Sequence, residues 1–242
     1  MKFTLFFEAA KHYISRRIKL KYKTEFGLWK LGPSKLRKAW TTLLFTIWAP
    51  SRAKVWDEKN QVSAIAVFLH EVRHVEDLIA QTVIFLWGYL TPQIYSFAFL
   101  AFFIVMEGLT NILPPWLWPW NMIVGFLIPL LPWPSPYRVD AERVAYAVST
   151  WIRIRRYSNF EDANLRVVAV DSLRKAFGGW LYYKMIWRKK TAERVAAEVF
   201  DQAIAWCRAE RDNKALSPAP FRSKRFTNVV MQLLEKPFRA KW

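Results

Sequence analysis

The 242-residue chain has only one cysteine and three histidines. The single cysteine, Cys207, excludes an internal disulfide and any metal site built from cysteines. Residues 1–20 alternate charged and apolar side chains, and they lack the apolar core and the cleavage site of a signal peptide. No segment recurs with a period of about 20 to 50 residues, so the sequence does not predict a solenoid.

Lysine and arginine are absent from Val75 to Tyr137, although the whole chain carries 37 basic and 19 acidic residues and a net charge of +18. Two apolar runs fill most of this gap, at 83–106 and 122–133. As a helix, the first run would be about 36 Å long, enough to cross a bilayer core of about 30 Å, whereas the second would reach only about 18 Å. The sequence predicts a hydrophobic helical hairpin at 83–133 that enters a membrane. A hairpin buried within a protein assembly is the alternative.

The positive charge of the chain indicates an anionic partner. Hydrophobic residues make up 53% of the sequence, with 14 tryptophans and 18 phenylalanines, a composition more typical of membrane proteins than of soluble nucleic-acid-binding proteins. We therefore expect the anionic headgroups of a lipid bilayer to be the partner. Nucleic acid is the weaker candidate, although residues 151–157 mix arginine with aromatic side chains that suit stacking on bases.

Helical spacing of apolar residues predicts a mainly α fold. A helix is expected from Asn60, as its cap, to about Ala80. Residues 40–49 are β-branched and aromatic and fit a short strand or a helix, so the fold includes a possible small β element near 40–50. Three further helices are expected. The first spans 140–151, the second begins after a capping box formed by residues 158–161, and the third runs from Thr191 to about Arg211.

Composition divides the chain into three regions. Residues 1–40 are basic and aromatic, and their apolar residues predict an amphipathic helix that either lies on a membrane or packs on the domain. Residues 41–210 form the main domain, with the hydrophobic hairpin inserted at 83–133. Residues 211–242 form a basic, proline-broken tail with one short helix near 226–234.

The sequence His70-Glu71-Val-Arg-His74 carries the main chemical signal. Because residues four apart on a helix project from nearly the same face, the two imidazoles can bind one Zn²⁺. Glu71 can then act as general base toward a metal-activated water, as in zinc hydrolases. The alternative interpretation is a pair of surface histidines on a helix.

A catalytic zinc usually has three protein ligands and one open position. The remaining histidine, His12, is remote in the sequence, so the third ligand is expected to be a carboxylate. Glu142 is the preferred candidate because it opens the helix that returns the chain after the hairpin. Asp140 and Glu76 are its rivals, although Glu76 points about 200° away from His74 on the same helix.

The two motifs together, His-Glu-Val-Arg-His at 70–74 and Glu-Arg-Val-Ala-Tyr at 142–146, resemble the gluzincin pattern of zinc metallopeptidases. The pattern is similar to that of integral-membrane peptidases of the HtpX and CaaX-protease kind, which also combine it with hydrophobic spans. The resemblance covers only these motifs and their order around the hairpin. Arg73 and Tyr146 stand where the family usually has glycine and aspartate.

The resemblance implies a helical zinc-metallopeptidase-like domain with three zinc ligands and one general base. The ligands would be His70, His74 and Glu142, and the base would be Glu71. Tyr146, Arg138 or Arg143 are candidate donors to the oxyanion that forms on a peptide carbonyl. Asp77 or Glu76 is expected to orient a histidine ring.

These patterns predict a membrane-associated zinc-dependent endopeptidase that hydrolyses polypeptide substrates. Because basic residues flank the hairpin on both sides, the positive-inside rule places both termini and the histidine site on the cytoplasmic side of a membrane. The alternative is a non-enzymatic structural or membrane-anchoring protein that retains a metal site. Such a protein would assemble into a larger complex, for example a viral particle.

Overall fold

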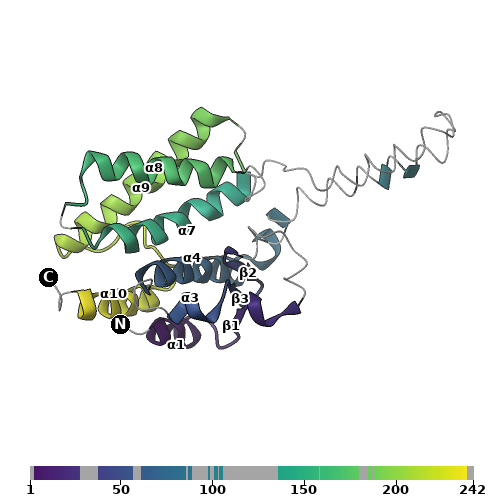
Figure 1. Ribbon diagram of the computed structural model, residues 1–242, viewed down its shortest axis with the longest axis horizontal. Helices are drawn as coiled ribbons and strands as arrows, with labels where there is room; N and C mark the ends of the chain where they lie inside the picture. The colour runs from purple at the N-terminus through teal and green to yellow at the C-terminus, as the bar shows by residue number, and fades with distance from the viewer. Residues whose placement is uncertain are drawn as a thin grey trace.

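The computed structural model describes residues 3–27, 38–56, 61–85, 87–88, 136–157, 159–179, 185–186 and 188–238, together with isolated positions between 98 and 105. The described part is mainly helical with one small sheet, as the sequence predicts. Two layers meet at a central pair of helices (Figure 1). One layer contains the sheet and the helices nearest the two chain ends, and the other contains three long helices.

The sheet contains β1 (Lys19–Tyr22), β2 (Thr41–Leu43) and β3 (Thr46–Ala49) in the order β1-β3-β2. β2 and β3 form an antiparallel hairpin within the segment whose character the sequence left open, and β1 pairs with β3 in parallel. The small β element near 40–50 is therefore confirmed. β1 was not expected, because its alternating lysines lie in a region interpreted as helical. A short 3-10 turn, η1 (Lys23–Glu25), follows β1.

Helix α4 (Gln61–Ala80) is the central element of the fold and has the bounds that the sequence predicts. Ile65, Leu69 and Val72 are buried on one side of this helix. The sequence also assigns Ile79 to this apolar stripe, but Ile79 is exposed, and the neighbouring Leu78 is buried instead. A short helix, α3 (Arg52–Trp56), packs on α4 just before it.

Helices from opposite ends of the chain pack together below α4. α1 (Phe3–Tyr13) contacts both α4 and α10 (Lys224–Phe238) (Figure 1). Phe3 is fully buried, and its ring lies 4.9 Å from the ring of Phe68 in α4. The apolar face of α1 is thus covered by protein, as in the second of the two arrangements left open by the sequence. α10 is longer than the predicted short helix and belongs to the core.

The upper layer consists of α7 (Pro136–Ile154), α8 (Ala163–Gly178) and α9 (Lys189–Arg211), with α7 lying on α4. The predicted capping box before α8 is wrong. The cap is Asp162, whose side chain accepts a hydrogen bond of 2.7 Å from the Asn164 backbone N–H. Glu161 instead accepts a hydrogen bond of 2.7 Å from Arg208 of α9, so it is not available to complete the box.

The predicted hydrophobic hairpin at 83–133 lies largely outside the described residues. Among the residues that the structure does describe, no helix has both the length and the apolar character to cross a bilayer. At the start of the run, Val83, Ile84 and Trp87 are exposed, whereas Phe85 is buried.

Candidate metal centre

Helix α4 presents two histidines toward α7. His70 and His74 lie one helical turn apart, as residues of an i, i+4 pair do, and their Nε2 atoms are 3.2 Å apart. Both side chains are buried at the contact between the two layers. The histidines therefore occupy the interior of the molecule, which contradicts the alternative of a pair of surface histidines.

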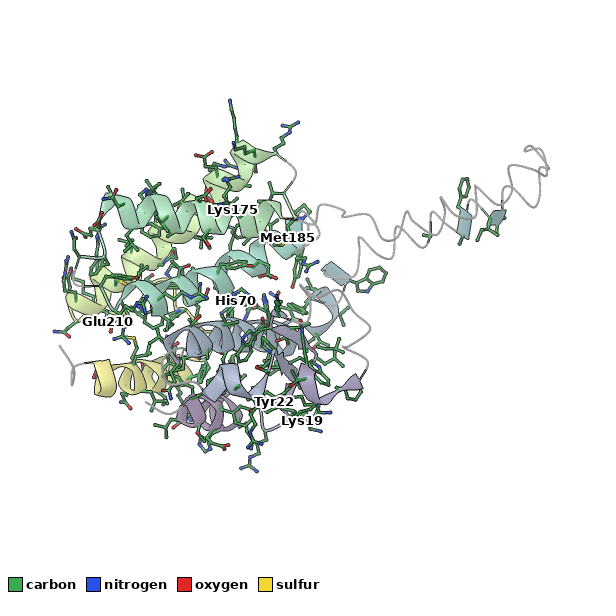
Figure 2. All side chains as sticks on the ribbon, in the orientation of Figure 1. Lys19, Tyr22, His70, Lys175, Met185 and Glu210 are labelled. Atoms are coloured by element: carbon green, nitrogen blue, oxygen red, sulfur yellow. The ribbon has the colours of Figure 1, made fainter. Side chains whose placement is uncertain are left out.

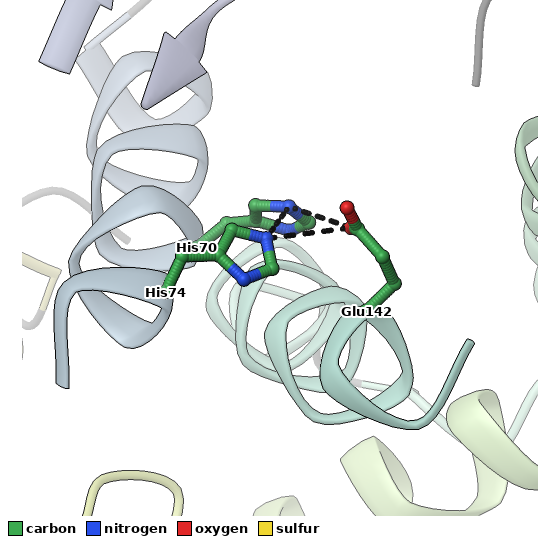
Figure 3. Close-up of side chains that lie close together, drawn as sticks. All are labelled: His70, His74 and Glu142. Carbon is green, nitrogen blue, oxygen red and sulfur yellow. Dashed lines mark hydrogen bonds and ion pairs between the residues drawn. The ribbon is translucent and has the colours of Figure 1, made fainter. Parts of the chain in front are cut away.

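Helix α7 adds a carboxylate from its first half. Glu142 Oε2 lies 3.2 Å from His70 Nε2 and 3.5 Å from His74 Nε2 (Figure 3). The structure thus brings together the three residues expected as ligands, His70, His74 and Glu142, and all three are buried. The rival carboxylates lie elsewhere: Asp140 is exposed and faces Arg143, and Glu76 accepts hydrogen bonds from residues 222 and 223.

The triangle formed by these three atoms fits a tetrahedral metal ion. A metal bound at about 2.0–2.1 Å by imidazole nitrogens and a carboxylate oxygen holds its ligand atoms about 3.3–3.4 Å apart. The three distances in the structure, 3.2, 3.2 and 3.5 Å, bracket this value. Two imidazoles and one carboxylate also form a donor set that suits Zn²⁺. The described residues can therefore hold a metal ion with little rearrangement.

Strong electrostatic coupling links the histidines to Glu142. Burial alone would raise the pKa of Glu142, but the charge of His74 and hydrogen bonds from both histidines hold the pKa of Glu142 well below its usual range. Burial likewise lowers the pKa of His74, but the charge and hydrogen bond of Glu142 outweigh this effect and raise the pKa. Without a metal, the site therefore favours an anionic carboxylate facing a protonated imidazole.

Glu71, the expected general base, is buried on the side of α4 that faces the sheet. Its Oε2 atom accepts a hydrogen bond of 2.7 Å from the hydroxyl of Thr42 in β2. The contact joins Glu71 to the sheet, and the negative charge of Glu71 is one of the effects that raise the pKa of His74. Sequence analysis missed this contact, because nothing in the sequence of β2 indicates which of its two neighbouring threonines faces α4.

Lys23 is a buried basic residue whose charge interacts with that of Glu71, and the sequence did not predict its burial. It is buried, and its ammonium group donates hydrogen bonds to the Ala39 carbonyl (2.9 Å) and the Thr41 hydroxyl (2.7 Å). Burial lowers the pKa of Lys23 to about 8, while the negative charge of Glu71 opposes this shift. Lys23 therefore ties the end of β1 to the start of β2, the strand that contacts Glu71.

The three candidate oxyanion donors occupy different surroundings. Tyr146 packs its ring against His70, with the ring centroids 4.7 Å apart. Arg143 faces away from the histidines and donates a hydrogen bond of 2.5 Å to Glu198 in α9. Arg138 is half-buried near the start of α7. Tyr146 is therefore in direct contact with a candidate ligand.

Arg73, between the two histidines, anchors a loop that precedes α10. Its guanidinium donates to Asp77 (3.0 Å) and to the Pro220 carbonyl (3.4 Å). Asp77 also accepts a hydrogen bond from Arg222 (2.8 Å), while Glu76 accepts backbone N–H bonds from residues 222 and 223. Asp77 and Glu76 were expected to orient a histidine ring. Their hydrogen bonds and ion pairs are instead with this loop and with Arg73. The loop before α10 is therefore attached to the C-terminal half of α4.

Comparison with known protein families, with curated proteins and with solved structures finds no match.

Proposed function

We propose that this protein is a membrane-associated, zinc-dependent endopeptidase. The observation that carries the proposal is the convergence of His70 Nε2, His74 Nε2 and Glu142 Oε2, with Glu71 adjacent to His70 on the same helix. A metal at this point would supply a Lewis acid that polarises a peptide carbonyl and lowers the pKa of a nearby water. The two short motifs that resemble the gluzincin pattern are the ones that meet at this point.

Glu71 is the residue that would move protons in this reaction. As a carboxylate next to the candidate ligands, it accepts a proton from the attacking water and returns it to the leaving amine. The Thr42 hydroxyl fixes the carboxylate through the hydrogen bond to Oε2. Tyr146, against the ring of His70, is the side chain best placed among the three candidates to donate to the developing oxyanion.

A polypeptide substrate is supported by the position of β2. β2 pairs with β3 only, so its other edge has no strand partner within the described part of the chain. An extended peptide can add to such an edge as a further strand. Because Thr42 of β2 contacts Glu71, a peptide bound along this edge would pass near the proposed general base.

Membrane association is supported by the sequence from Val75 to Tyr137, which contains no lysine or arginine. In our proposal this segment enters the bilayer, and the metal centre and both termini lie on the cytoplasmic side, where the basic residues gather.

A structural metal centre in a non-enzymatic protein is the second candidate function. It is favoured by the burial of all four central residues, His70, Glu71, His74 and Glu142. A metal there would join α4 to α7 and so hold the two layers together. Metal content alone does not separate the two functions, because both require a bound ion.

Metal binding is tested on the full chain, purified in detergent and dialysed against a weak chelator. Elemental analysis is expected to give about one zinc per chain for the wild type. His70→Ala is expected to lose the metal, because it removes one of three ligands. His12→Ala is the matched control, since it removes an exposed histidine of α1, and it should retain the metal. Wild-type protein without stoichiometric metal would contradict both candidate functions.

Catalysis is tested by incubating the zinc-loaded protein with a peptide library and identifying products by mass spectrometry. Glu71→Gln should retain zinc but lose about 100-fold or more of the cleavage rate, the usual effect of removing a general base. Glu193→Gln, at an exposed position of α9, is the control and should cleave like the wild type. Zinc binding without cleavage by the wild type would favour the structural centre instead.

A further inference from the structure

The register of the sheet sorts its side chains onto two faces. Leu20 pairs with Ile47, and Thr42 pairs with the same residue from the other side, so these three form one row across the sheet. Ile47 is fully buried and Thr42 contacts Glu71 of α4. Because successive residues of a strand point to opposite faces, the rows on either side of this one point away from α4.

The opposite face, which we call the outer face of the sheet, carries two rows. One row pairs Lys19 with Thr46 and Leu43, and the other pairs Lys21 with Trp48 and Thr41. Lys19, Lys21 and Leu43 are exposed. Lys19 lies at the periphery of the described body, whereas His70 lies in its interior (Figure 2).

Two leucines form the tip of the hairpin between β2 and β3 at one end of the outer face. Leu43 is 64% exposed and Leu44 is 54% exposed. Leu44 also has a φ of 54°, in the left-handed region that glycine and asparagine adopt more readily than leucine. The two-residue turn between β2 and β3 calls for a positive φ, so turn geometry explains this backbone conformation. The two exposed leucines leave an apolar tip on the described part of the fold.

Further exposed apolar surface and several cations surround this tip. Phe26 is exposed and its ring packs at a tilt against Trp48, with the ring centroids 5.3 Å apart. Lys21 also lies over Trp48, and Arg17 lies over Phe45, the residue that follows the leucine pair. The cations placed on this surface are Arg17, Lys19 and Lys21, and Glu25 is the only acidic residue in segment 15–27.

We propose that the outer face of the sheet and its leucine tip bind the surface of an anionic phospholipid membrane. Leu43 and Leu44 would enter the headgroup region, while the surrounding lysines and Arg17 contact lipid phosphates. The charge of the surface is complementary to such a partner. The strands and the residues that open the apolar run, at 83–88, also lie toward the same end of the described body (Figure 1). This inference rests on the membrane association in the proposed function and is independent of the metal chemistry.

The test uses a fluorescent label at the tip of the hairpin. Cys207 is buried, and burial raises the pKa of its thiol to about 12, so it should not react with a thiol-directed dye. Leu43→Cys in the full chain therefore accepts a single polarity-sensitive dye. Val168→Cys is the matched control, because Val168 is 69% exposed on α8, in the other layer.

Each labelled protein is incorporated into lipid nanodiscs of phosphatidylcholine, with or without phosphatidylglycerol, and co-elution with the nanodiscs is measured first. The dye at position 43 should emit at shorter wavelength in the anionic nanodiscs than in the neutral ones. The combined change Lys19→Glu and Lys21→Glu should abolish this shift, and the dye at position 168 should show none. Co-elution with a water-like emission at position 43 in both lipids would overturn this inference alone. Failure to co-elute would overturn the proposed membrane association as well. An equal shift at position 168 would show non-specific contact with the lipid and would also overturn the inference.

Discussion

The hydrogen bond between Thr42 and Glu71 can be used to distinguish a catalytic metal centre from a structural one. A metal that only joins α4 to α7 needs its ligands, and Glu71 has no part in that role. In an enzyme, the orientation of the Glu71 carboxylate affects the rate of proton transfer. The Thr42 hydroxyl donates to this carboxylate at 2.7 Å, so its removal should affect catalysis without affecting the ligands.

Thr42→Val is expected to lower kcat by about 10- to 150-fold, because a hydrogen bond to a charged group contributes about 1.5–3 kcal/mol. Zinc content should remain at the wild-type value. Thr46→Val, on the outer face of the sheet, is the matched control and should leave kcat unchanged. Steady-state kinetics on a peptide cleaved by the wild type provide the measurement. An unchanged kcat in Thr42→Val would contradict a role for this hydrogen bond.

Arg73→Met is expected to lower the free energy of unfolding by about 3 kcal/mol, because it leaves the buried carboxylates of Glu76 and Asp77 without this cation. Urea denaturation measures the effect. The comparison variant is Arg166→Met, which breaks an exposed pair with Asp201 and should cost at most about 1 kcal/mol. Equal losses in the two variants would show that the loop before α10 does not depend on Arg73.

At the scale of single residues, local spacing made His70, His74 and Glu71 predictable, because an i, i+4 pair on a helix depends only on helix geometry. The roles of Thr42, Lys23 and Arg73 were not predictable. Thr42 and Lys23 act through contacts that depend on the register of the sheet. Arg73 meets residues about 150 positions later in the chain, a pairing that no local pattern encodes.

At the scale of secondary-structure elements, the packing of α4 on α7 brings the site together. Each helix carries only part of the donor set, so the metal and the helix contact should stabilise one another. The competing ligand is the proton. The pKa of His74 is raised from its usual 6.5 and that of Glu142 is lowered from its usual 4.5. In the metal-free protein, the His74 contribution is complete below about pH 6.5 and is lost as the pH rises through the folded pKa.

The Glu142 contribution has the opposite sign. It is complete above about pH 4.5 and is lost as the pH falls through the lowered folded pKa. The pair therefore stabilises the metal-free protein most between about pH 4.5 and 6.5. Zinc binding requires a neutral His74. The rise in Tm on adding zinc should therefore be small near pH 6 and larger toward pH 8. The binding free energy of zinc should become more favourable by up to about 1.4 kcal/mol per pH unit for each proton released. Thermal melts with and without zinc test this, and a zinc effect independent of pH would contradict displacement of a proton from His74.

Helical periodicity predicted α4 and α9 closely, because their apolar residues recur over about five turns or more. Prediction from local sequence patterns was wrong where a side chain has a partner in another element. Glu161 fits a capping box in the sequence, but the structure pairs it with Arg208, and Asp162 caps α8 instead. β1 was missed for a related reason, since its exposed lysines on the outer face resemble the polar side of a helix.

At the scale of the whole molecule, the fold places both ends of the described chain in one layer and the metal centre between the layers. α10 packs on α1 and belongs to the core, although composition suggested a basic tail. Composition describes the exposed residues of such a helix, while its buried face, with Phe226, Val230 and Leu234, decides where it packs. The exposed apolar side chains Val83, Ile84 and Trp87 lead into the apolar run.

Membrane association predicts the behaviour of the full chain in detergent phase separation. The protein should partition into the detergent phase after cell lysis, because the apolar run needs a non-aqueous environment. Replacing residues 90–131 by a short glycine-serine linker should move the protein to the aqueous phase while zinc binding persists. Partitioning of the unaltered chain into the aqueous phase without detergent would contradict insertion and favour a hairpin buried in an assembly.

X-ray absorption at the zinc edge tests most directly whether His70, His74 and Glu142 bind one zinc ion. Full-length protein loaded with one equivalent of zinc should show a shell of nitrogen and oxygen at about 2.0–2.2 Å, with the outer-shell scattering of two imidazoles. His70→Ala should reduce this imidazole scattering by about half or abolish zinc binding altogether, while His12→Ala should leave the spectrum unchanged. A zinc spectrum without imidazole scattering, or one unaltered by His70→Ala, would contradict the assignment.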